Sequence, residues 1–475
     1  MKRTKIIASI GPSSNQPDVM EQMVLAGMNV ARINFSHATE EEKQLAQDSV
    51  REVRKRTGHN IAILWDTKGP EFRSGVLEGE TIDLIEGNTI RIVKENVVGN
   101  EQRITVNHPQ ALDDLVVGDV ILLENAKMKV EVISIETDED EGGAGVTCKI
   151  INGGKLGNRK SLSIPGKKLN IPYISENDRN DIKYACEHGG EFLAISFVSG
   201  PEDVLEVKEL LKEYGREDLK IICKIESELG VQNLEKILEV SNGAMVARGD
   251  LGTEVPSEML PILQKRMIKT CRKMKKICIV ATEMLETMME NMRPKRAETS
   301  DIANAVLDGT DAVMLSGETT IGKHPIETVR AMAKICETAE QYYDYERHFD
   351  EGYAQDITTT IAHNVVESTT LLDVKAIVAA TVSGATAEII SNLKPKSPII
   401  AACSTEKVAR RLALNYGVYP AVLPIYDTTD EVINNAVEIA KQKLNLQPKD
   451  IVIVTGGFPR GGEHATNFLK IQEIK

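Results

Sequence analysis

Residues 243–284 read GAMVARGDLGTEVPSEMLPILQKRMIKTCRKMKKICIVATEM, and the fold prediction begins from this stretch. It opens with a short apolar run, Gly243–Asp250, and closes with a second one, Ile277–Met284. Between them, Pro256–Lys276 has the length and the apolar spacing that are typical of an amphipathic helix. A strand, a helix and a second strand in this order favour a right-handed crossover, so we expect the two strands to lie parallel in one sheet.

The same unit recurs along the first two thirds of the chain. Eight short runs rich in β-branched or apolar residues alternate with segments of helical length. The predicted strands are Thr4–Gly11, Val30–Ser36, Ile61–Thr67, Leu193–Ser199, Lys220–Ser227, Gly243–Asp250, Ile277–Met284 and Asp311–Glu318. Eight strand–helix units are what a closed (β/α)₈ barrel requires, so we predict an α/β fold built on such a barrel.

One interval between predicted strands is far longer than the others. Residues 68–192 separate the third strand from the fourth, and short β-branched runs at 81–85, 89–93, 119–123 and 129–133 fill much of it, punctuated by Gly, Asn and Asp. This pattern predicts a small all-β domain inserted in a barrel loop. We therefore expect a β-barrel lid domain at 71–166, with the (β/α)₈ barrel at 1–70 and 167–343.

The pattern changes again after residue 343. A charged and aromatic connector is followed by predicted strands at 376–380, 398–402, 419–423 and 450–455, which alternate with helical segments. We predict a C-terminal open-sheet α/β domain over residues 344–475.

The composition argues against several classes of function. The 475 residues carry a formal net charge of −14, which argues against an extended contact with nucleic acid. Seven cysteines without a Cys-x-x-Cys pair argue against a disulfide framework or a structural zinc site, and favour a reducing, cytoplasmic location. We see no signal peptide and no apolar run of the roughly 18 residues that a membrane span needs.

The predicted strands are unusually polar at their carboxyl ends, where barrels of this kind carry their working residues. Alternation along the fifth strand, for example, places Lys224 and Glu226 on one face and Cys223 and Ile225 on the other. The polar set at the mouth is Arg32, Asn34, Ser36, Asp66, Thr67, Lys224, Glu226, Arg248, Asp250 and Thr282. An ordinary ion pair would explain any one of them, but unpaired buried polar groups are costly and the pattern recurs on five strands, which favours a site.

The mixture of charges indicates the chemistry. Glu226 and Asp250 are hard oxygen ligands on neighbouring strands, suited to Mg²⁺ or Mn²⁺, and no His or Cys accompanies them as zinc would favour. Positive charge comes from Arg32, Arg73, Lys224 and Arg248. A divalent metal and several cations in one mouth suit a phosphoryl group during transfer. Free N–H groups at the helix start near Gly249 could hold a carboxylate.

Seven stretches of the chain resemble the pyruvate kinase family. They are Thr4–Ser13, Ala31–His37, Asp66–Arg73, Ile222–Ser227, Val246–Pro256, Ala281–Met288 and Arg296–Thr319. The runs DTKGPE at 66–71 and MLSGET at 314–319 are highly specific, and the two additional domains fall where that family has them. The resemblance implies a glycolytic phosphotransferase that makes pyruvate and ATP from phosphoenolpyruvate and ADP. Because the sequence stops at Lys475, we expect a member without the extra C-terminal domain of some bacterial relatives.

The resemblance also implies roles for single residues. Phosphoenolpyruvate would be held by Arg32, Lys224, Gly249, Asp250 and Thr282. Lys224 would neutralise the phosphoryl group in transfer, Thr282 would lie near the proton route to the enolate, and Arg248 would support the site. Metal ligands would be Glu226 and Asp250 for Mg²⁺, and Asn34, Ser36, Asp66 and Thr67 for K⁺. The nucleotide, with a second Mg²⁺, would contact Asn34, Phe35, Ser36, His37, Arg73 and Lys160.

Three positions refine this picture. Glu71 stands where family members that depend on K⁺ have Glu, so we predict K⁺ dependence, although Glu71 could also serve only in a local salt bridge. Glu283 replaces a more usual Gln beside Thr282, and strand alternation would point it away from the substrate. Thr320 replaces a more usual Ala. Neither change removes a functional group.

A second candidate site lies in the C-terminal domain. Thr381, Ser383, Gly384 and Thr386 lie between a predicted strand and a helix start, where hydroxyls and glycine suit a phosphate. Ordinary helix capping is the alternative explanation. A second loop, 455–462, could add backbone amides and Arg460. By resemblance we expect a sugar-phosphate or nucleotide effector, whose identity stays open, and a homotetramer.

Two other functions fit parts of the pattern. A metal-dependent lyase or aldolase acting on pyruvate enolate would also use Arg32, Glu226 and Asp250, but would not need the K⁺ ligands, Arg73 or Lys160. An inactive regulatory relative would keep the fold alone. Such a protein should have lost one of its catalytic charges, and none is lost.

Overall fold

The computed structural model describes residues 1–36, 38–137, 143–345, 356–423, 428–457 and 466–475. Eight parallel strands close into a barrel in the order β1-β16-β15-β14-β13-β12-β3-β2. Their bounds are Lys5–Ser9 (β1), Val30–Asn34 (β2), Ala62–Asp66 (β3), Phe192–Ile195 (β12), Lys220–Ile225 (β13), Gly243–Ala247 (β14), Ile277–Ala281 (β15) and Ala312–Leu315 (β16). The predicted barrel is confirmed, with every strand at its predicted place.

The barrel strands are buried on both faces, as parallel strands covered by helices usually are. Alternation divides their side chains between two cores. Ile6 and Ile33, for example, pack outward against the helices, whereas Ile7 and Leu64 fill the barrel interior. The outer layer contains α1 (Pro17–Ala26), α2 (Glu40–Thr57), α3 (Glu176–His188), α4 (Pro201–Glu213), α6 (Leu234–Val240), α8 (Leu260–Lys273), α9 (Arg296–Asp308) and α11 (Pro325–Glu340).

The helices begin where the sequence offers a cap. The Oγ1 of Thr39 accepts the backbone N–H of Glu42 over 3.2 Å, and the Glu42 carboxylate accepts the N–H of Thr39, which forms a capping box at the start of α2. Ser175 and Asp178 make the same motif at the start of α3. Each box satisfies two backbone donors that a helix start would otherwise leave free, so the helix start is fixed locally.

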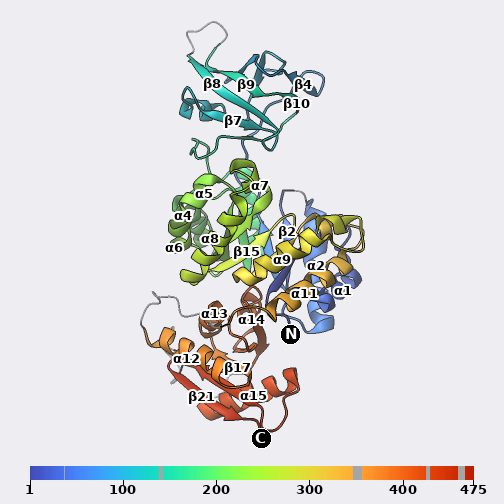
Figure 1. Cartoon of the computed structure of the whole chain (residues 1–475), viewed down its shortest axis with the longest axis vertical. Helices are drawn as coiled ribbons and strands as arrows, with labels where there is room; N and C mark the ends of the chain where they lie inside the picture. The colour runs from blue at the N-terminus through green and yellow to red at the C-terminus, as the bar shows by residue number, and fades with distance from the viewer. Residues whose placement is uncertain (37, 138–142, 346–355, 424–427, 458–465) are drawn as a thin grey trace.

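The inserted segment folds on its own core beyond the barrel mouth (Figure 1). A six-stranded sheet has the order β11-β7-β8-β9-β5-β6, and β10 pairs separately with β4. The bounds are Thr81–Leu84 (β4), Thr89–Val93 (β5), Arg103–Thr105 (β6), Val120–Leu123 (β7), Met128–Glu136 (β8), Gly145–Asn152 (β9), Gly154–Gly157 (β10) and Leu162–Ser163 (β11). Of these, β4, β5, β7 and β8 lie where we predict strands, whereas β6, β9, β10 and β11 were not predicted. No hydrogen-bonded closure into a β-barrel occurs among the described residues.

The C-terminal segment forms an open five-stranded sheet at the opposite end of the barrel, where α13 and α14 face the barrel (Figure 1). The strand order is β19-β18-β17-β20-β21, and only β21 runs antiparallel. The elements are α12 (Ile357–Leu371), β17 (Val374–Thr381), α13 (Ala385–Asn392), β18 (Ile399–Cys403), α14 (Glu406–Arg411), β19 (Val418–Val422), α15 (Thr429–Leu444), β20 (Ile451–Gly456) and β21 (Phe468–Glu473). The last strand was not predicted.

The two ends of the barrel therefore face different partners. Ala413 and Leu414 of the C-terminal segment join the inner barrel core and close its floor. The mouth, at the carboxyl ends of the strands, faces the inserted sheet. None of the described helices is long and apolar enough to cross a membrane.

Candidate active site

Four charged side chains of alternating sign contact one another at the carboxyl ends of β2, β3 and β13, and we call them the charge network. The Nε of Arg32 donates to the Oδ2 of Asp66 over 2.6 Å. The Nζ of Lys224 lies 3.3 Å from the Oδ1 of Asp66 and 3.0 Å from the Oε1 of Glu226. The two acidic side chains are at most 1% exposed, whereas Arg32 and Lys224 keep 10% and 13% of their side-chain surface exposed. The cations therefore face the mouth, which suits an anionic substrate.

The members of the charge network shift each other's pKa values. Burial acts to raise the pKa of Asp66, but Arg32 and Lys224 outweigh it and hold that pKa below its ordinary value. Burial acts to lower the pKa of Lys224, but Asp66 and Glu226 outweigh it and raise that pKa. Burial raises the pKa of Glu226, and the charge of Asp250 adds to the effect while Lys224 opposes it. Lys224 is thus held as a cation, and the Glu226 carboxylate would gain from a further positive charge.

Two residues that the sequence analysis did not single out hold the charge network in place. The Oγ of Ser196, which is 1% exposed, accepts a hydrogen bond from the Nζ of Lys224 over 2.7 Å and donates to the carbonyl of Thr67 over 2.7 Å. The next residue, Phe197, donates its backbone N–H to the Oε2 of Glu226 over 2.6 Å and has a φ of +55°. A positive φ at such a residue is costly unless its surroundings impose it, and such residues gather at functional sites. The available signal was a serine, Ser196, within the apolar run of the predicted strand Leu193–Ser199.

The chain leaves β14 and β15 earlier than predicted. Because β14 ends at Ala247, Arg248 and Asp250 lie in the first turn of α7 (Arg248–Glu254) and do not share a strand face. Because β15 ends at Ala281, Thr282 and Glu283 lie beyond it, with φ of +70° and +52°. The prediction that Arg248 and Asp250 share a strand face is therefore wrong, and strand alternation does not determine where the side chain of Glu283 points. Glu283 is exposed, so solvent hydrates its additional carboxylate.

Arg248 fixes the turn that carries Thr282. One guanidinium nitrogen donates to the carbonyls of Thr282 and Glu283, over 2.5 and 3.2 Å, and the other pairs with Asp301 at 2.5 Å. This turn places the Oγ1 of Thr282 where it accepts the backbone N–H of Gly249 over 2.8 Å. Thr282 and Gly249, which come from different strand–helix units, are thus in direct contact. Arg248 is buried and acts on the site through protein groups.

The predicted K⁺ ligands gather on the neighbouring ends of β2 and β3. Asn34 and Asp66 are paired in the register of these two strands. The Oδ1 of Asn34 accepts the backbone N–H of Ser36 over 3.0 Å, and Ser36 itself is exposed. Thr67 is 4% exposed, and its Oγ1 accepts the backbone N–H of Ser196 over 3.4 Å. The structure therefore brings these oxygen-bearing residues to one corner of the mouth.

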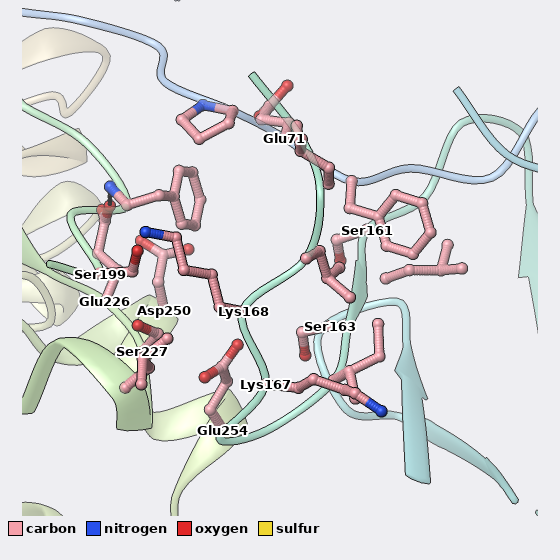
Figure 2. Close-up of a pocket in the computed structure, with 18 of the residues that line it drawn as sticks. Glu71, Ser161, Ser163, Lys167, Lys168, Ser199, Glu226, Ser227, Asp250 and Glu254 are labelled. Carbon is pink, nitrogen blue, oxygen red and sulfur yellow. Dashed lines mark hydrogen bonds between the residues drawn. The ribbon is translucent and has the colours of Figure 1, made fainter. Parts of the chain in front are cut away.

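A cavity of about 230 Å³ lies between the barrel mouth and the inserted sheet. Glu226 and Asp250 line its barrel side, and Glu71 and Arg73 line the other side. Figure 2 shows the side chain of Lys168, which the sequence analysis did not single out, pointing toward Glu226 and Asp250. A cleft with two carboxylates at its base and cations on its rim can hold a metal together with a phosphate.

The two cations predicted to contact the nucleotide differ in how strongly carboxylates of the protein already bind them. Arg73 makes a two-pronged contact with Glu71, at 2.8 and 2.5 Å, and Glu71 also pairs with Lys68 at 2.9 Å. The Nζ of Lys160 lies 3.8 Å from Glu124 and its side chain is 44% exposed. Lys160 can therefore reach a ligand easily, whereas Arg73 would have to share its guanidinium with Glu71.

The aromatic ring of Phe35 points away from the cleft. It is 7% exposed and stacks on Trp65, with ring centroids 5.2 Å apart. Tyr184 meets the same ring edge-on at 6.0 Å. Any contact of Phe35 with a nucleotide would therefore involve its backbone. His37, the last residue predicted for this contact, lies outside the described residues.

The predicted effector residues form a tight turn between β17 and α13. The Oγ1 of Thr381 accepts the backbone N–H of Gly384, which has a φ of +100°, over 2.9 Å. The hydroxyl of Thr386 is buried against that of Thr466 at 2.8 Å. Ser383 is exposed. Its Oγ accepts the backbone N–H of Ala385 over 3.4 Å, so all three hydroxyls already have protein partners. Arg460 of the second loop lies outside the described residues.

The mouth offers a donor set for a divalent cation. Within the described ranges, no group of three or more His, Cys, Asp or Glu side chains is arranged as a complete metal site. Glu226 and Asp250 nevertheless supply two hard oxygen ligands. Burial raises the pKa of Glu226 and the charge of Asp250 adds to the effect, so a cation bound by both carboxylates would relieve their repulsion. This set fits Mg²⁺, which usually takes one or two carboxylates and fills its remaining positions with water and phosphate oxygens.

Comparison with known proteins relates both the barrel and the C-terminal segment to one family. Residues 1–329 match the family model "Pyruvate kinase, barrel domain", and residues 359–472 match "Pyruvate kinase, alpha/beta domain". Over the whole chain, a pyruvate kinase of Geobacillus stearothermophilus is 44% identical, with 80% of that protein covered. One from Staphylococcus saprophyticus is 41% identical, with 81% covered. A solved pyruvate kinase structure from Cryptosporidium parvum superposes with a TM-score of 0.92 at 35% identity, covering 99% of this chain and 96% of that one.

Proposed function

The chain belongs to the pyruvate kinase family of phosphotransferases, and on that premise we propose that it transfers the phosphoryl group of phosphoenolpyruvate to ADP with Mg²⁺ and K⁺. In this reaction the bond between phosphorus and the enol oxygen breaks, and a bond to a terminal oxygen of ADP forms. The enolate that remains takes up a proton at its methylene carbon and becomes pyruvate.

The observation that carries this proposal is the position of Lys224. Its ammonium is anchored by Asp66, Glu226 and Ser196, and it keeps part of its surface toward the mouth. A cation held in this way can neutralise charge on a phosphoryl group without having to reorganise during the reaction. Arg32, held by Asp66, would bind the same phosphoryl group from the adjacent strands.

The carboxylate of the substrate would lie at the first turn of α7. The backbone N–H groups of Gly249 and Asp250 are at a helix start, where donors without intrahelical partners favour an anion. Thr282 contacts the N–H of Gly249 and would orient the substrate there. Its hydroxyl would also lie on the proton route to the enolate carbon.

Two sets of oxygen-bearing residues would hold the cations. Glu226 and Asp250 would hold Mg²⁺, which when bound polarises the phosphoryl oxygens. Asn34, Ser36, Asp66 and Thr67 would hold K⁺. Because Glu71 supplies no positive charge of its own, we expect K⁺ dependence, with Glu71 also neutralised locally by Lys68 and Arg73.

The nucleotide would lie between the mouth and the inserted sheet. Arg73 and the exposed Lys160 would contact its phosphates, together with the backbone near Phe35 and with Ser36. Closure of the inserted sheet over the mouth would exclude water, which would otherwise compete with ADP for the phosphoryl group.

Regulation would involve the turn between β17 and α13. A sugar phosphate or a nucleotide would bind near Thr381, Ser383 and Gly384, in a homotetramer. The double variant Thr381→Ala with Ser383→Ala should lose its activation by sugar phosphates or AMP. Thr381 accepts the N–H of Gly384 over 2.9 Å, whereas exposed Ser383 accepts that of Ala385 over a longer 3.4 Å, so the single variant Ser383→Ala is the cleaner test of binding. An unchanged response to every effector in both variants would remove this site from the account.

The reaction is tested by omission. We expect pyruvate formation from phosphoenolpyruvate in the presence of ADP, Mg²⁺ and K⁺, and its loss when any one of the three is omitted, with Na⁺ replacing K⁺ at constant ionic strength. Activity without ADP would indicate a hydrolase or a lyase. Equal rates in Na⁺ and K⁺ would reject the K⁺ site while leaving the transfer reaction in place.

A further inference from the structure

Three cationic side chains line the cleft between the barrel mouth and the inserted sheet, and they differ in their partners. Arg73 is held by the two-pronged contact with its neighbouring carboxylate, and Lys167 pairs with Asp119. Within the described ranges, the ion pair of Lys168 is with Glu202 at 4.0 Å, and these two side chains are 58% and 70% exposed. An exposed pair at this distance contributes little to stability, so Lys168 can leave it for a ligand.

The backbone of Lys168 is tied to the inserted sheet. Lys168 lies on the connection that leads from β11 back to α3 of the barrel. On one side of it, Lys167 pairs with Asp119, and on the other the backbone N–H of Asn170 donates to the Oδ2 of Asp114 over 2.5 Å. Because the inserted segment anchors both flanks, we expect Lys168 to move with this segment when it closes over the mouth.

The side chain of Lys168 reaches in the other direction, across the cleft. Figure 2 shows it pointing from the connection toward Glu226 and Asp250. Glu254 also lines the cleft on the barrel side. The turn just before Lys168 contains Gly166 at a φ of +71°, a conformation that favours glycine. A lysine carried by the inserted segment therefore faces a wall of carboxylates that belongs to the barrel.

We propose that Lys168 binds the phosphoryl group of phosphoenolpyruvate, an inference that rests on the function proposed above. Mg²⁺ takes carboxylate and phosphate oxygens at the same time, so a cation aimed at Glu226 and Asp250 is aimed also at the phosphate that would share their ion. The carboxylate of the substrate would have the backbone donors of α7. The phosphoryl group would have Arg32 and Lys224 on the barrel side, and Lys168 supplies the cation on the side of the inserted sheet.

This position gives Lys168 a role that depends on closure. While the inserted segment is open, Lys168 contributes only its weak pair with Glu202. Once the segment closes on a bound substrate, the attraction between Lys168 and the phosphoryl group stabilises the closed form. Binding of phosphoenolpyruvate and exclusion of water from the mouth are then favoured by the same contact.

Calorimetric titration with 2-phospholactate in the presence of Mg²⁺ and K⁺ tests the contact without turnover. This saturated analogue keeps the carboxylate and the phosphoryl group but cannot release an enolate. We expect Lys168→Met to bind it about tenfold more weakly, because a hydrogen bond to a charged group is lost, and Lys168→Arg to keep most of the affinity. Lys155→Met, which removes a lysine from an exposed position of β10, is the matched control and should bind normally.

Oxalate and ADP identify the group that Lys168 contacts. Oxalate is a planar dicarboxylate that binds Mg²⁺ but has no phosphoryl group, so we expect Lys168→Met to bind it like the unchanged protein. Equal weakening for oxalate and 2-phospholactate would indicate a general disturbance of the cleft and overturn the proposal. Weakening for ADP with Mg²⁺, with 2-phospholactate unaffected, would also overturn it.

Glu202→Gln tests the structural alternative, in which Lys168 only joins the inserted segment to α4 through its ion pair. We expect this variant to bind 2-phospholactate as tightly as the unchanged protein. If Glu202→Gln and Lys168→Met weakened binding equally, the ion pair would be the cause and the proposal would fall.

The failure of this inference differs from the failure of the proposed function. If the unchanged protein bound 2-phospholactate and Lys168→Met bound it equally well, the role of Lys168 alone would be overturned. If the unchanged protein bound neither 2-phospholactate nor oxalate with Mg²⁺, the proposed substrate would be wrong, and this inference with it.

Discussion

At the scale of single residues, the position of Lys224 depends on a small number of buried contacts. Asp66 and Glu226 supply the opposite charge, and Ser196 supplies an acceptor and a link to the backbone of Thr67. The charges determine that Lys224 is protonated, while the hydroxyl helps to determine where the ammonium points. These are separable contributions, which point variants can distinguish.

Removal of the Ser196 hydroxyl should reduce turnover more than stability. In Ser196→Ala, Lys224 loses one acceptor, and we expect kcat to fall by about ten- to a hundredfold, as for a hydrogen bond to a charged group. Losing an acceptor also lowers the pKa of Lys224, so the alkaline limb of the pH–rate profile should move to lower pH. Steady-state kinetics across pH measure both effects.

Ser196→Cys serves as the matched control, because a thiol keeps a weak acceptor at the same position. We expect it to recover part of the lost turnover. If Ser196→Ala kept the kcat and the alkaline limb of the unchanged protein, the positioning role of Ser196 would be wrong.

Sequence reasoning succeeded for residues whose place follows from strand geometry. Lys224 and Glu226 lie together because they are two residues apart, and Asn34 and Asp66 because their strands are neighbours. It failed for Thr282 and Glu283, because a positive φ after the last strand residue cannot be read from alternation. Ser196 was missed because its importance depends on contacts with Lys224 and Thr67, which are far away in the sequence.

At the scale of elements, the barrel strands end sooner than their sequence patterns suggest. Each was predicted one to four residues too far at its carboxyl end; β14, for example, stops at Ala247 rather than Asp250. The polar residues just beyond the strands belong to turns and helix starts. These turns present backbone N–H groups as well as side chains, which a straight strand could not do.

Arg248, in the first turn of α7, holds the turn that follows β15. In Arg248→Met, the carbonyls of Thr282 and Glu283 and the carboxylate of Asp301 lose their donors. We expect the turn that carries Thr282 to relax, with kcat/KM for phosphoenolpyruvate falling by about a hundredfold, since misplacement of about 1 Å can cost this much. The KM for ADP should change much less, because the predicted nucleotide contacts lie elsewhere.

Kinetics with each substrate varied in turn would separate these effects, with the thermal midpoint recorded alongside. Arg330→Met is a suitable control, because this exposed arginine pairs only weakly within α11. An equal rise in both KM values, or a loss explained by unfolding alone, would contradict the role given to Arg248.

Element prediction was accurate where periodicity was strong and incomplete elsewhere. Every barrel strand overlaps its predicted run, and β12 alone among them begins one residue before it, because a buried parallel strand is a continuous apolar segment. β21 was missed because its pattern, FLKIQE, mixes charge with apolar residues at the edge of the sheet. Of the inserted strands, β4, β5, β7 and β8 were found and the other four were missed. Their pairing was not predicted, because local sequence does not encode which strands meet.

At the scale of the whole molecule, the C-terminal segment closes the barrel floor and buries charge there. Lys5 of β1 is 2% exposed, donates to the carbonyl of Val418 over 2.5 Å, and lies 4.5 Å from the ring centroid of Tyr419. Burial, reinforced by Lys2 and opposed by Glu340, lowers the pKa of Lys5 to about 7. This contact therefore couples the packing of two large units to pH.

The sign of this coupling follows from proton binding. Between about pH 7 and the ordinary lysine pKa of 10.5, the unfolded chain holds a proton on Lys5 that the folded chain does not. The free energy of unfolding should therefore rise with pH through this window, by at most about 1.4 kcal/mol per pH unit from this group. Lys5→Met should remove that part of the slope.

The measurement is unfolding by urea at several pH values within this window, followed by the fluorescence of Trp65, the single tryptophan of the chain. Trp65 is fully buried in the barrel and therefore reports on its integrity. Lys236→Met, on the exposed face of α6, controls for the loss of a lysine. Identical pH slopes for Lys5→Met and this control would contradict the assignment.

We propose that Asp66 and Glu226, by their buried charges, hold Lys224 ready to neutralise a phosphoryl group. The most direct test is the turnover number of Lys224→Met for pyruvate formation from phosphoenolpyruvate, ADP, Mg²⁺ and K⁺, compared with that of Lys236→Met. We predict a fall of about 10²- to 10³-fold for the first variant, the range seen when one preorganised donor is removed, and none for the second. A fall of less than about tenfold in a folded Lys224→Met would contradict the account.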